Sequence, residues 1–260
     1  MNAAPPSDQD GDWSIFDTQR VKAMRLVAEH ADGGWFVGDD ELGAVFTGAG
    51  TITANGLVSA RSGVSVAELQ GLRSRLRAGQ ELRSVQLGTE ASAEQIDWAA
   101  TLGLKRVGEI PTMTMDLRKA TDASAHPFNI RLAGPGDSDK MTQCITDGFE
   151  LDTLAASAPF ANRSFLARPE VTAVVVAGAD GDIVSVGVSV HAASHVVGLY
   201  AIATHPEHRR QGHGAAVTRG LMAAAREHGA TVAYLQASAS GAPVYTRIGF
   251  IRHSTRTYLF

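Results

Sequence analysis

The sequence predicts an α/β (α+β) fold made of two similar units, each a mixed, partly antiparallel sheet flanked by helices. Two observations support this prediction. Short apolar runs of strand length alternate with helical patterns along the chain, and the order of elements in residues 12–118 recurs in residues 129–260. The stretches EQIDWAATLGLKRVG and SGAPVYTRIGFIRHS each predict a short helix, a glycine and a last strand. We interpret the recurrence as an internal duplication.

The first half predicts a helix, three short strands at WFVG, LGAVF and NGLVSA, and then two helices separated by the strand RSVQLG. These two helices begin at capping boxes, Ser65 with Glu68 and Ser92 with Gln95. The half ends in LKRVGEIPTMTMDL, a strand or strand pair. Pro111 would confine this strand to a sheet edge or a bulge.

The second half predicts the strand NIRLA, the helix DSDKMTQCITDGF, a helix and loop at SAPFANRSFLARP, a hairpin that turns at ADGD, and the strand HVVGLYAIA. A glycine-rich loop follows, then a helix that stops at Gly229, the strand TVAYLQA, a short helix and a last strand. Two segments lie outside the units. Residues 1–11 are a leader that we expect to be disordered, and residues 119–128 have the composition of a linker.

Composition excludes several classes of protein. The 260 residues are 44% hydrophobic and carry a formal net charge of -4, which is typical of a globular protein of one or two domains. No block of basic residues is present, so we expect no nucleic-acid partner. We expect no membrane partner and a cytoplasmic location, because no apolar run approaches the ~18 residues of a membrane helix and no secretory signal pattern is present. Cys144 is the single cysteine, which excludes an intramolecular disulfide.

The stretch HPEHRRQGHGAA lies between an apolar strand and a helix. Gly212 and Gly214 leave the backbone uncovered where helix N–H groups and the helix dipole favour an anion, and Arg209 and Arg210 add positive charge. The dinucleotide fingerprint would need a glycine in place of Val217, and the Gly-Lys-Ser/Thr of a P-loop is absent. In isolation the stretch is more typical of a solvated turn, and only its context favours an anion site.

The residues RRQGHGA resemble the Q/R-x-x-G-x-G/A signature of the GNAT superfamily of N-acetyltransferases. VGLYAIA, VAYLQAS and PVYTRIGF resemble the strand before the loop, the strand after its helix and the tyrosine-bearing short helix of that family. The resemblance covers residues 129–260, whereas the first half shows the element order without the signature. It implies acetyl-CoA as co-substrate, with the pyrophosphate in the loop. The cofactor-binding residues that it implies are Ile202, Ala203, Thr204, Arg209, Arg210, Gln211, Gly212, His213, Gly214 and Ala215.

The resemblance also implies catalytic roles. Tyr245 would be the general acid that returns a proton to the CoA thiolate, and backbone groups near Ile202 and Thr204 would polarise the thioester carbonyl. The alternative for Tyr245 is a packing role under the last strand. Several relatives place an acidic residue early in the strand before the loop, where this chain has VVG. The base therefore stays open among Glu150, Asp152, His191, His195 and a base acting through water.

We predict direct transfer of an acetyl group to a small-molecule or peptide amine, by a monomer or homodimer. The identity of the amine stays open, and the alternative function is an acyl-CoA-binding sensor or scaffold without turnover. No metal is expected, because His205, His208 and His213 match no familiar ligand spacing. We read Cys144 as structural.

The first half is expected to be a degenerate GNAT-like domain. The stretch ARSGVSVAE replaces the signature, the box of Ser65 with Glu68 already satisfies that helix end, and Ala99 takes the place of Tyr245. We therefore expect one acetyl-CoA per chain, bound by the second half, with the first half shaping the amine site.

Overall fold

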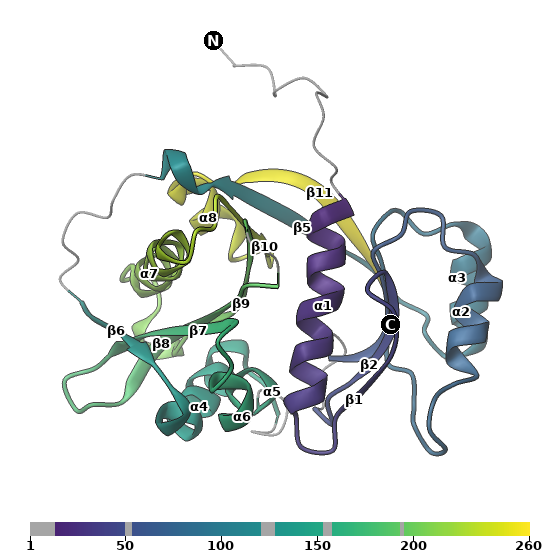
Figure 1. Cartoon of the computed structure of the whole chain (residues 1–260), viewed down its shortest axis with the longest axis horizontal. Helices are drawn as coiled ribbons and strands as arrows, with labels where there is room; N and C mark the ends of the chain where they lie inside the picture. The colour runs from purple at the N-terminus through teal and green to yellow at the C-terminus, as the bar shows by residue number, and fades with distance from the viewer. Residues whose placement is uncertain (1–13, 50–53, 121–127, 153–157, 193–194) are drawn as a thin grey trace, which may run out of the picture.

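The computed structural model describes residues 14–49, 54–120, 128–152, 158–192 and 195–260 (Figure 1). Its strands form one mixed sheet in the order β1-β2-β3-β4-β11-β5-β10-β9-β8-β7-β6, with helices on both faces. The α/β fold class is confirmed, and the two predicted sheets are joined edge to edge. The predicted leader and most of the predicted linker lie outside the described residues.

The elements of the first half follow the predicted order. They are α1 (Ser14–His30), β1 (Trp35–Gly38), β2 (Leu42–Phe46), β3 (Asn55–Ser59), α2 (Val66–Arg73), β4 (Val85–Leu87), α3 (Ala93–Thr101) and β5 (Val107–Asp116). Both capping boxes are present. The Glu68 N–H donates to Ser65 Oγ at 3.2 Å and the Ser65 N–H donates to the Glu68 carboxylate at 2.9 Å. Ser92 and Gln95 form the same pair of bonds, which sets where α3 begins.

The second half also follows the predicted order. Its elements are β6 (Asn129–Ala133), α4 (Ser138–Phe149), α5 (Ala158–Ala161), α6 (Arg163–Leu166), β7 (Val171–Ala177), β8 (Ile183–Val190), β9 (Val196–Thr204), α7 (His213–Glu227), β10 (Val232–Gln236), α8 (Ala242–Ile248) and β11 (Ile251–Leu259). The chain leaves α7 through Gly229, whose φ of 84° is the left-handed conformation that favours glycine.

The last strands of the two halves are exchanged. β11 lies between β4 and β5, and β5 lies between β11 and β10, so each half ends inside the sheet of the other. β5 and β11 pair antiparallel, with Val107 opposite Leu259 and Thr114 opposite Ile251. Each side of this central pair carries one parallel pair of strands, β3 with β4 on one side and β9 with β10 on the other. The exchange ties the two halves into one sheet.

Pro111 does not place β5 at a sheet edge, so the edge alternative of the sequence prediction was wrong. β5 lies in the middle of the sheet, and Pro111 stands opposite Thr255 of β11. The Pro111 carbonyl accepts a 3.0 Å hydrogen bond from the Ala237 N–H, one residue beyond the end of β10. The N–H that proline lacks would point to the same side, past the end of the ladder, and so little pairing is lost. A bulge between Arg252 and Ser254 of β11 lies beside it.

Helices cover both faces of the sheet. On one face, α1 and α4 to α6 share an apolar cluster with the strands, built from residues such as Val21, Val45, Met141, Phe165 and Val186. On the other face, α7 and α8 pack over the second half and α2 and α3 over the first. α1 crosses the junction between the halves (Figure 1). No described helix is long and apolar enough to span a membrane.

Candidate active site

β9 and β10 separate just before the glycine-rich loop. They pair in parallel from Val196 opposite Val232 to Leu199 opposite Leu235, but β9 continues to Thr204. Residues 200–204 keep β8 on one side, and among the described strands none pairs with them on the other. Backbone N–H and C=O groups of this stretch are therefore open to a ligand that lies along it.

A β-bulge lies in the same stretch. Val186 stands opposite Ala203 and Val188 opposite Tyr200, so Ala201 and Ile202 together face Gly187. Ala201 has a φ of 49°, a left-handed conformation that alanine rarely adopts. Such bulges interrupt the ladder and redirect backbone groups. Nothing in the sequence indicated the bulge, because alanine is not a residue that favours this conformation.

Gly187 lets α7 pack directly over the bulge. A Cβ at this position would lie 2.7 Å from Val217 Cγ1, 2.9 Å from Leu221 Cδ1 and 3.1 Å from Ile202 Cγ1. The absence of a side chain therefore sets how closely α7 approaches β8 and β9. Gly187 was not among the predicted site residues, although a glycine inside an apolar strand is a signal of close approach.

The loop between β9 and α7 presents a run of backbone N–H groups. Arg210 and Gly212 have φ values of 63° and 94°, and Gly212 is the N-cap of α7. The Ala216 N–H donates to the Gly212 carbonyl at 3.0 Å and opens the helical ladder. Within the part of the chain that the structure describes, no hydrogen-bond partner faces the N–H groups of residues 210–215. Such a run at a helix N-terminus can bind an anion.

The end of β9 adjoins this helix N-terminus. A Cβ at Gly214 would lie 3.4 Å from Thr204 Oγ1, and that hydroxyl is 2.9 Å from Ser185 Oγ of β8. The open stretch of β9 therefore leads directly into the run of N–H groups. The structure brings together the predicted residues Ile202 to Thr204, at the end of β9, and Arg210 to Ala215, in the loop and the first turn of α7.

The two arginines of the loop have different roles. Arg209 Nη1 donates to Glu150 Oε1 at 2.8 Å, and its Nη2 donates to the Gly148 carbonyl at 2.9 Å. Arg209 therefore caps the C-terminus of α4, and its charge is paired. Arg210 is exposed, and no described residue pairs with it. Of the two arginines that the sequence placed beside the anion site, Arg210 alone has no ion-pair partner among the described residues.

Two of the candidate bases lie at the wrong end of the sheet. His191 follows β8, and His195 precedes β9, where its carbonyl accepts from the Thr231 N–H at 2.9 Å. The nine residues of β9 place its first residue about 26 Å from its last at strand rise. These histidines are therefore not brought to the loop. Asp152 is exposed, and Glu150 is held by Arg209.

Tyr245 lies on α8 and is 9% exposed. Its ring meets Phe250 edge-on at 5.9 Å and belongs to the cluster that contains Val217 and Leu235. Burial raises the pKa of the phenol to about 12, so Tyr245 keeps its proton near neutral pH. No described residue hydrogen-bonds its hydroxyl. Both the packing role and a proton-donor role are compatible with this environment.

The predicted linker touches the loop at its end. Phe128 packs on His213, the first residue of α7, with ring centroids 4.3 Å apart. Burial lowers the pKa of His213, which favours the neutral imidazole. Burial also raises the pKa of the Cys144 thiol to about 12, which suits a structural role. Within the described ranges, no group of three or more His, Cys, Asp or Glu is arranged to hold a metal ion.

Several residues beside the opening were not predicted. The hydroxyl groups of Tyr200 and Tyr234 are hydrogen-bonded to each other. Burial raises the pKa of Tyr200 to about 12. Arg20 of α1 donates from Nε to Gln236 Oε1 at 3.0 Å, at the end of β10. The first half thus places a side chain next to the opening of the second half. Helical periodicity could assign Arg20 to a helix face, but it could not indicate that distant contact.

The comparisons with known proteins agree with this geometry. Residues 170–252 match the family model of the GNAT acetyltransferase domain. The chain is similar to a GCN5-related N-acetyltransferase from Kribbella flavida, with 20% identity, a TM-score of 0.65 and 95% of each chain covered. It is also similar to a protein from Novosphingobium aromaticivorans assigned to the GNAT family, with 17% identity, a TM-score of 0.61 and 94% of each chain covered.

A conserved protein of unknown function from Staphylococcus epidermidis has a similar fold, with 10% identity, a TM-score of 0.64 and coverage of 85% of this chain and 91% of that one. No curated protein matches the chain. Residues 170–252, which run from before β7 into β11, are therefore similar to a GNAT acetyltransferase domain. Enzymes of this family use an acyl-CoA as co-substrate. The match includes the open stretch of β9, the loop and Tyr245.

Proposed function

We propose that the chain is an acetyl-CoA-dependent N-acetyltransferase that moves an acetyl group directly onto an amine. One observation carries the proposal: the open, bulged end of β9 leads without a break into the unpaired N–H groups of residues 210–215. The loop leaves room for a ligand beside Gly212, because a Cβ at that position would meet only Phe128, at 3.7 Å. Residues 200–204 would hold the pantetheine arm, and the loop would hold the pyrophosphate.

Acetyl transfer from a thioester to an amine needs few catalytic side chains. A thioester is already activated, and a neutral amine is already a nucleophile, so no covalent enzyme intermediate is needed. Backbone N–H groups near Ile202 and Thr204 would stabilise the charge that develops on the carbonyl oxygen. Tyr245 would give its proton to the departing thiolate, and its raised pKa keeps it protonated for that step.

The base that receives the amine proton is the least defined part of the proposal. His191 and His195 lie at the far end of the strands, and Glu150 is held by Arg209. We therefore favour removal of the proton through water. The amine is a small-molecule or peptide amine, whose identity follows from the experiment below.

We also propose that residues 12–118 are a degenerate GNAT-like domain, that residues 119–128 link it to the second half, and that residues 129–260 are the catalytic domain. The repeated strand pairings about β5 and β11 support this division. The first half would not bind acetyl-CoA, because Ser65 and Glu68 already satisfy the start of α2. Ala99, which is fully buried, takes the place of Tyr245.

Incubation with acetyl-CoA and a panel of amines tests the function, with release of free thiol as the readout. Amino acids, polyamines, amino sugars and peptide N-termini make up the panel. Thiol release with at least one amine and one acetyl-CoA site per chain by calorimetry are the expected results. Acetyl-CoA binding without thiol release for any amine would favour the sensor alternative. Two sites per chain would overturn the assignment of the first half.

A further inference from the structure

Buried polar side chains meet where α1 crosses the sheet between the two halves (Figure 1). Arg20 of α1 is 3% exposed, and it donates hydrogen bonds to side chains of three strands. These acceptors are Gln236 of β10, Gln86 of β4 and Tyr258 of β11. The hydroxyl of Tyr258 also donates to Gln236 Oε1, at 2.7 Å. Because the members come from both halves, the cluster forms only in the assembled sheet.

The cluster holds more positive than negative charge. Arg256 of β11 is 1% exposed, and it donates to the carboxylate of Asp17 on α1 and, at 3.1 Å, to the Ser59 carbonyl. No described carboxylate pairs with Arg20, whose positive charge, after burial, lowers the pKa of Arg256. Burial also lowers the pKa of His253 near Asp17, which keeps that imidazole neutral. One carboxylate therefore faces two buried cations.

Several N–H donors of the cluster have no partner among the described residues. Arg20 Nη1, Gln236 Nε2 and Arg256 Nε are all buried and unpaired. The orientation of the Gln236 amide is fixed, because its Oε1 accepts from Arg20 Nε and from the Tyr258 hydroxyl. Buried donors are normally satisfied in folded proteins, and an anionic acceptor binds a guanidinium more strongly than a neutral one. The unpaired donors therefore indicate an anion that the described chain does not itself supply.

The cluster adjoins the open end of β9. Gln236 is the last residue of β10 and follows Leu235, where the pairing of β10 with β9 ends. Leu235 packs with α7, so by strand alternation Gln236 points to the opposite face, which carries α1. Burial raises the pKa of Tyr200, the first residue of the open stretch, to about 12, and the nearby charge of Arg20 partly offsets that rise. Gln236 and Tyr200 are partly exposed, so a ligand in the opening can reach the cluster.

We propose that the amine substrate is an amino acid, and that Arg20 Nη1 and Gln236 Nε2 bind its carboxylate. The inference rests on the proposed transferase function and names its substrate class. Acetyl-CoA would lie along β9 and the start of α7, and the amino acid would enter from the face that carries α1. A carboxylate supplies the missing negative charge, whereas a polyamine or an amino sugar would bring a further positive charge to the cluster. Arg20 and Gln236 would then determine substrate specificity.

A comparison of each L-amino acid with its own carboxamide tests the proposal, because the carboxamide keeps the amine and the side chain but lacks the carboxylate. Release of free thiol from acetyl-CoA measures kcat/KM for each compound. At least one amino acid is expected to have a kcat/KM about tenfold or more above that of its carboxamide. Amine reactivity alone favours the carboxamide, whose amine loses its proton at a lower pH. A preference for the acid therefore reports binding of the carboxylate.

Gln236→Glu tests the site through charge. It places a carboxylate beside Arg20, which gives the buried cation a charged partner and repels the carboxylate of the substrate. The preference for the acid is expected to fall from about tenfold to about onefold, with acetyl-CoA affinity unchanged. Gln70→Glu is the matched control, because it adds the same charge at an exposed position of α2, and it is expected to change nothing.

Arg20→Met removes the cation itself and serves if Gln236→Glu does not fold. The preference for the acid is again expected to be lost. Arg25→Met is its control, because Arg25 lies on the same helix and its side chain is 46% exposed. An acid preference that survives in a folded Gln236→Glu or Arg20→Met variant would overturn the inference.

The outcomes separate this inference from the proposed function. Thiol release with some amine, but with equal kcat/KM for acids and carboxamides, would overturn the inference and leave the function standing. If no amine releases thiol, the proposed function fails, and thermal unfolding with CoA present then decides the inference. An amino acid that raises Tm more than its carboxamide in the wild type, but not in Gln236→Glu, would support the carboxylate site. Equal shifts for every acid and its carboxamide would overturn it.

Discussion

Arg20 Nε donates a 3.0 Å hydrogen bond to Gln236 Oε1, which joins the first helix of the chain to the strand that ends beside the candidate active site. The same guanidinium donates to Gln86 of β4 and, at 2.9 Å, to the hydroxyl of Tyr258 of β11. Arg20 is 3% exposed, and these three partners are neutral. A buried cation held by neutral acceptors depends on these hydrogen bonds for its stability.

Arg20→Met is expected to lower the free energy of unfolding by about 2–4 kcal/mol, because it removes three hydrogen bonds made by one buried guanidinium group. Urea unfolding followed by circular dichroism measures the change. Arg25→Met on the same helix is the matched control, since Arg25 is 46% exposed and pairs with Glu29 at the surface. A loss below about 1 kcal/mol is expected there. Equal losses in the two variants would contradict the role given to Arg20.

Gly212→Glu is expected to weaken acetyl-CoA binding at least about 100-fold, because it puts a negative charge at the N–H groups that would receive the pyrophosphate. Calorimetry measures the affinity. Gly229→Glu is the control, since Gly229 has a φ of 84° against 94° for Gly212 and lies at the other end of α7. Both variants bear similar backbone strain and the same charge. Unchanged affinity in Gly212→Glu would refute the anion site.

Tyr245→Phe is expected to lower kcat by about 10²–10⁴, the usual effect of losing a general acid, with little change in acetyl-CoA affinity. Thermal stability should change little, because no described residue hydrogen-bonds the Tyr245 hydroxyl. Since burial raises the pKa of Tyr245 to about 12, its ionisation should not reduce the wild-type rate below about pH 11. Wild-type turnover in the variant would leave Tyr245 with a packing role alone.

Gly187→Ala is expected to push α7 away from β8 and so to lower both stability, by about 1–3 kcal/mol, and acetyl-CoA affinity. The added methyl would lie 2.7 Å from Val217 Cγ1. Gly71→Ala is the contrast, because Gly71 is an exposed glycine of α2 with nothing within 4 Å of its Cβ position. That change should stabilise the chain by about 0.5–1 kcal/mol. Urea unfolding and calorimetry compare the two, and tolerance of Gly187→Ala would show that α7 can shift freely.

Stability is expected to fall as pH is lowered from about 7.5 to 5.5. Burial lowers the pKa of His191, His213 and His253 in the folded chain, so near and below about pH 6.5 the unfolded chain binds more protons. The stability is therefore full above that pH and is lost as the pH falls through the unfolded pKa and toward the folded one. His191→Gln should reduce the difference in unfolding free energy between the two pH values. His195→Gln is the control, because His195 is exposed. If the two variants show the same dependence of unfolding free energy on pH, burial of His191 does not cause the loss of stability.

The sequence by itself determined the features that depend on residues within one or two turns of each other. Ser65 with Glu68 and Ser92 with Gln95 set the starts of two helices, because a capping box is a contact between residues three apart. Gly212 at the start of α7 and Gly229 after its end follow from the same local chemistry. The loop, its strand and the tyrosine-bearing helix were recognisable because their spacing along the chain is short.

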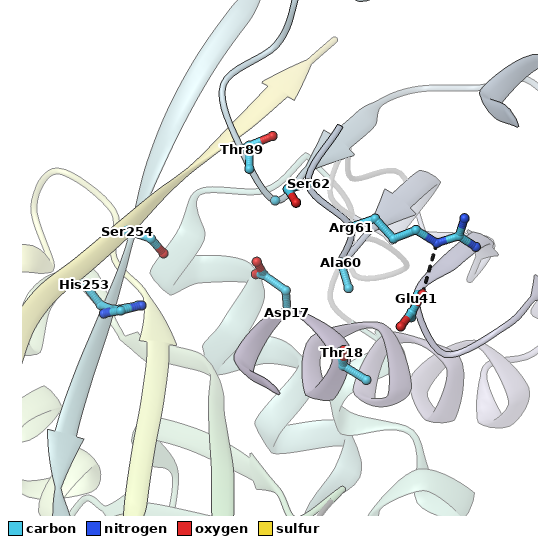
Figure 2. Close-up of a pocket in the computed structure, with 10 residues that line it drawn as sticks. Asp17, Thr18, Glu41, Ala60, Arg61, Ser62, Thr89, His253 and Ser254 are labelled. Carbon is cyan, nitrogen blue, oxygen red and sulfur yellow. Dashed lines mark hydrogen bonds and ion pairs between the residues drawn. The ribbon is translucent and has the colours of Figure 1, made fainter. Parts of the chain in front are cut away.

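Only the tertiary structure decided how the halves meet. β5 pairs with strands that lie more than 100 residues further along the chain, so no local pattern could place Pro111 in the middle of the sheet. The bulge at Ala201 and the contact of Arg20 with Gln236 also depend on partners from distant segments. A pocket beside Asp17 is assembled from α1, three loops and β11 (Figure 2). Hydrophobic periodicity reports which face of an element is buried, whereas strand order and site assembly depend on non-local pairing, on which it carries no information.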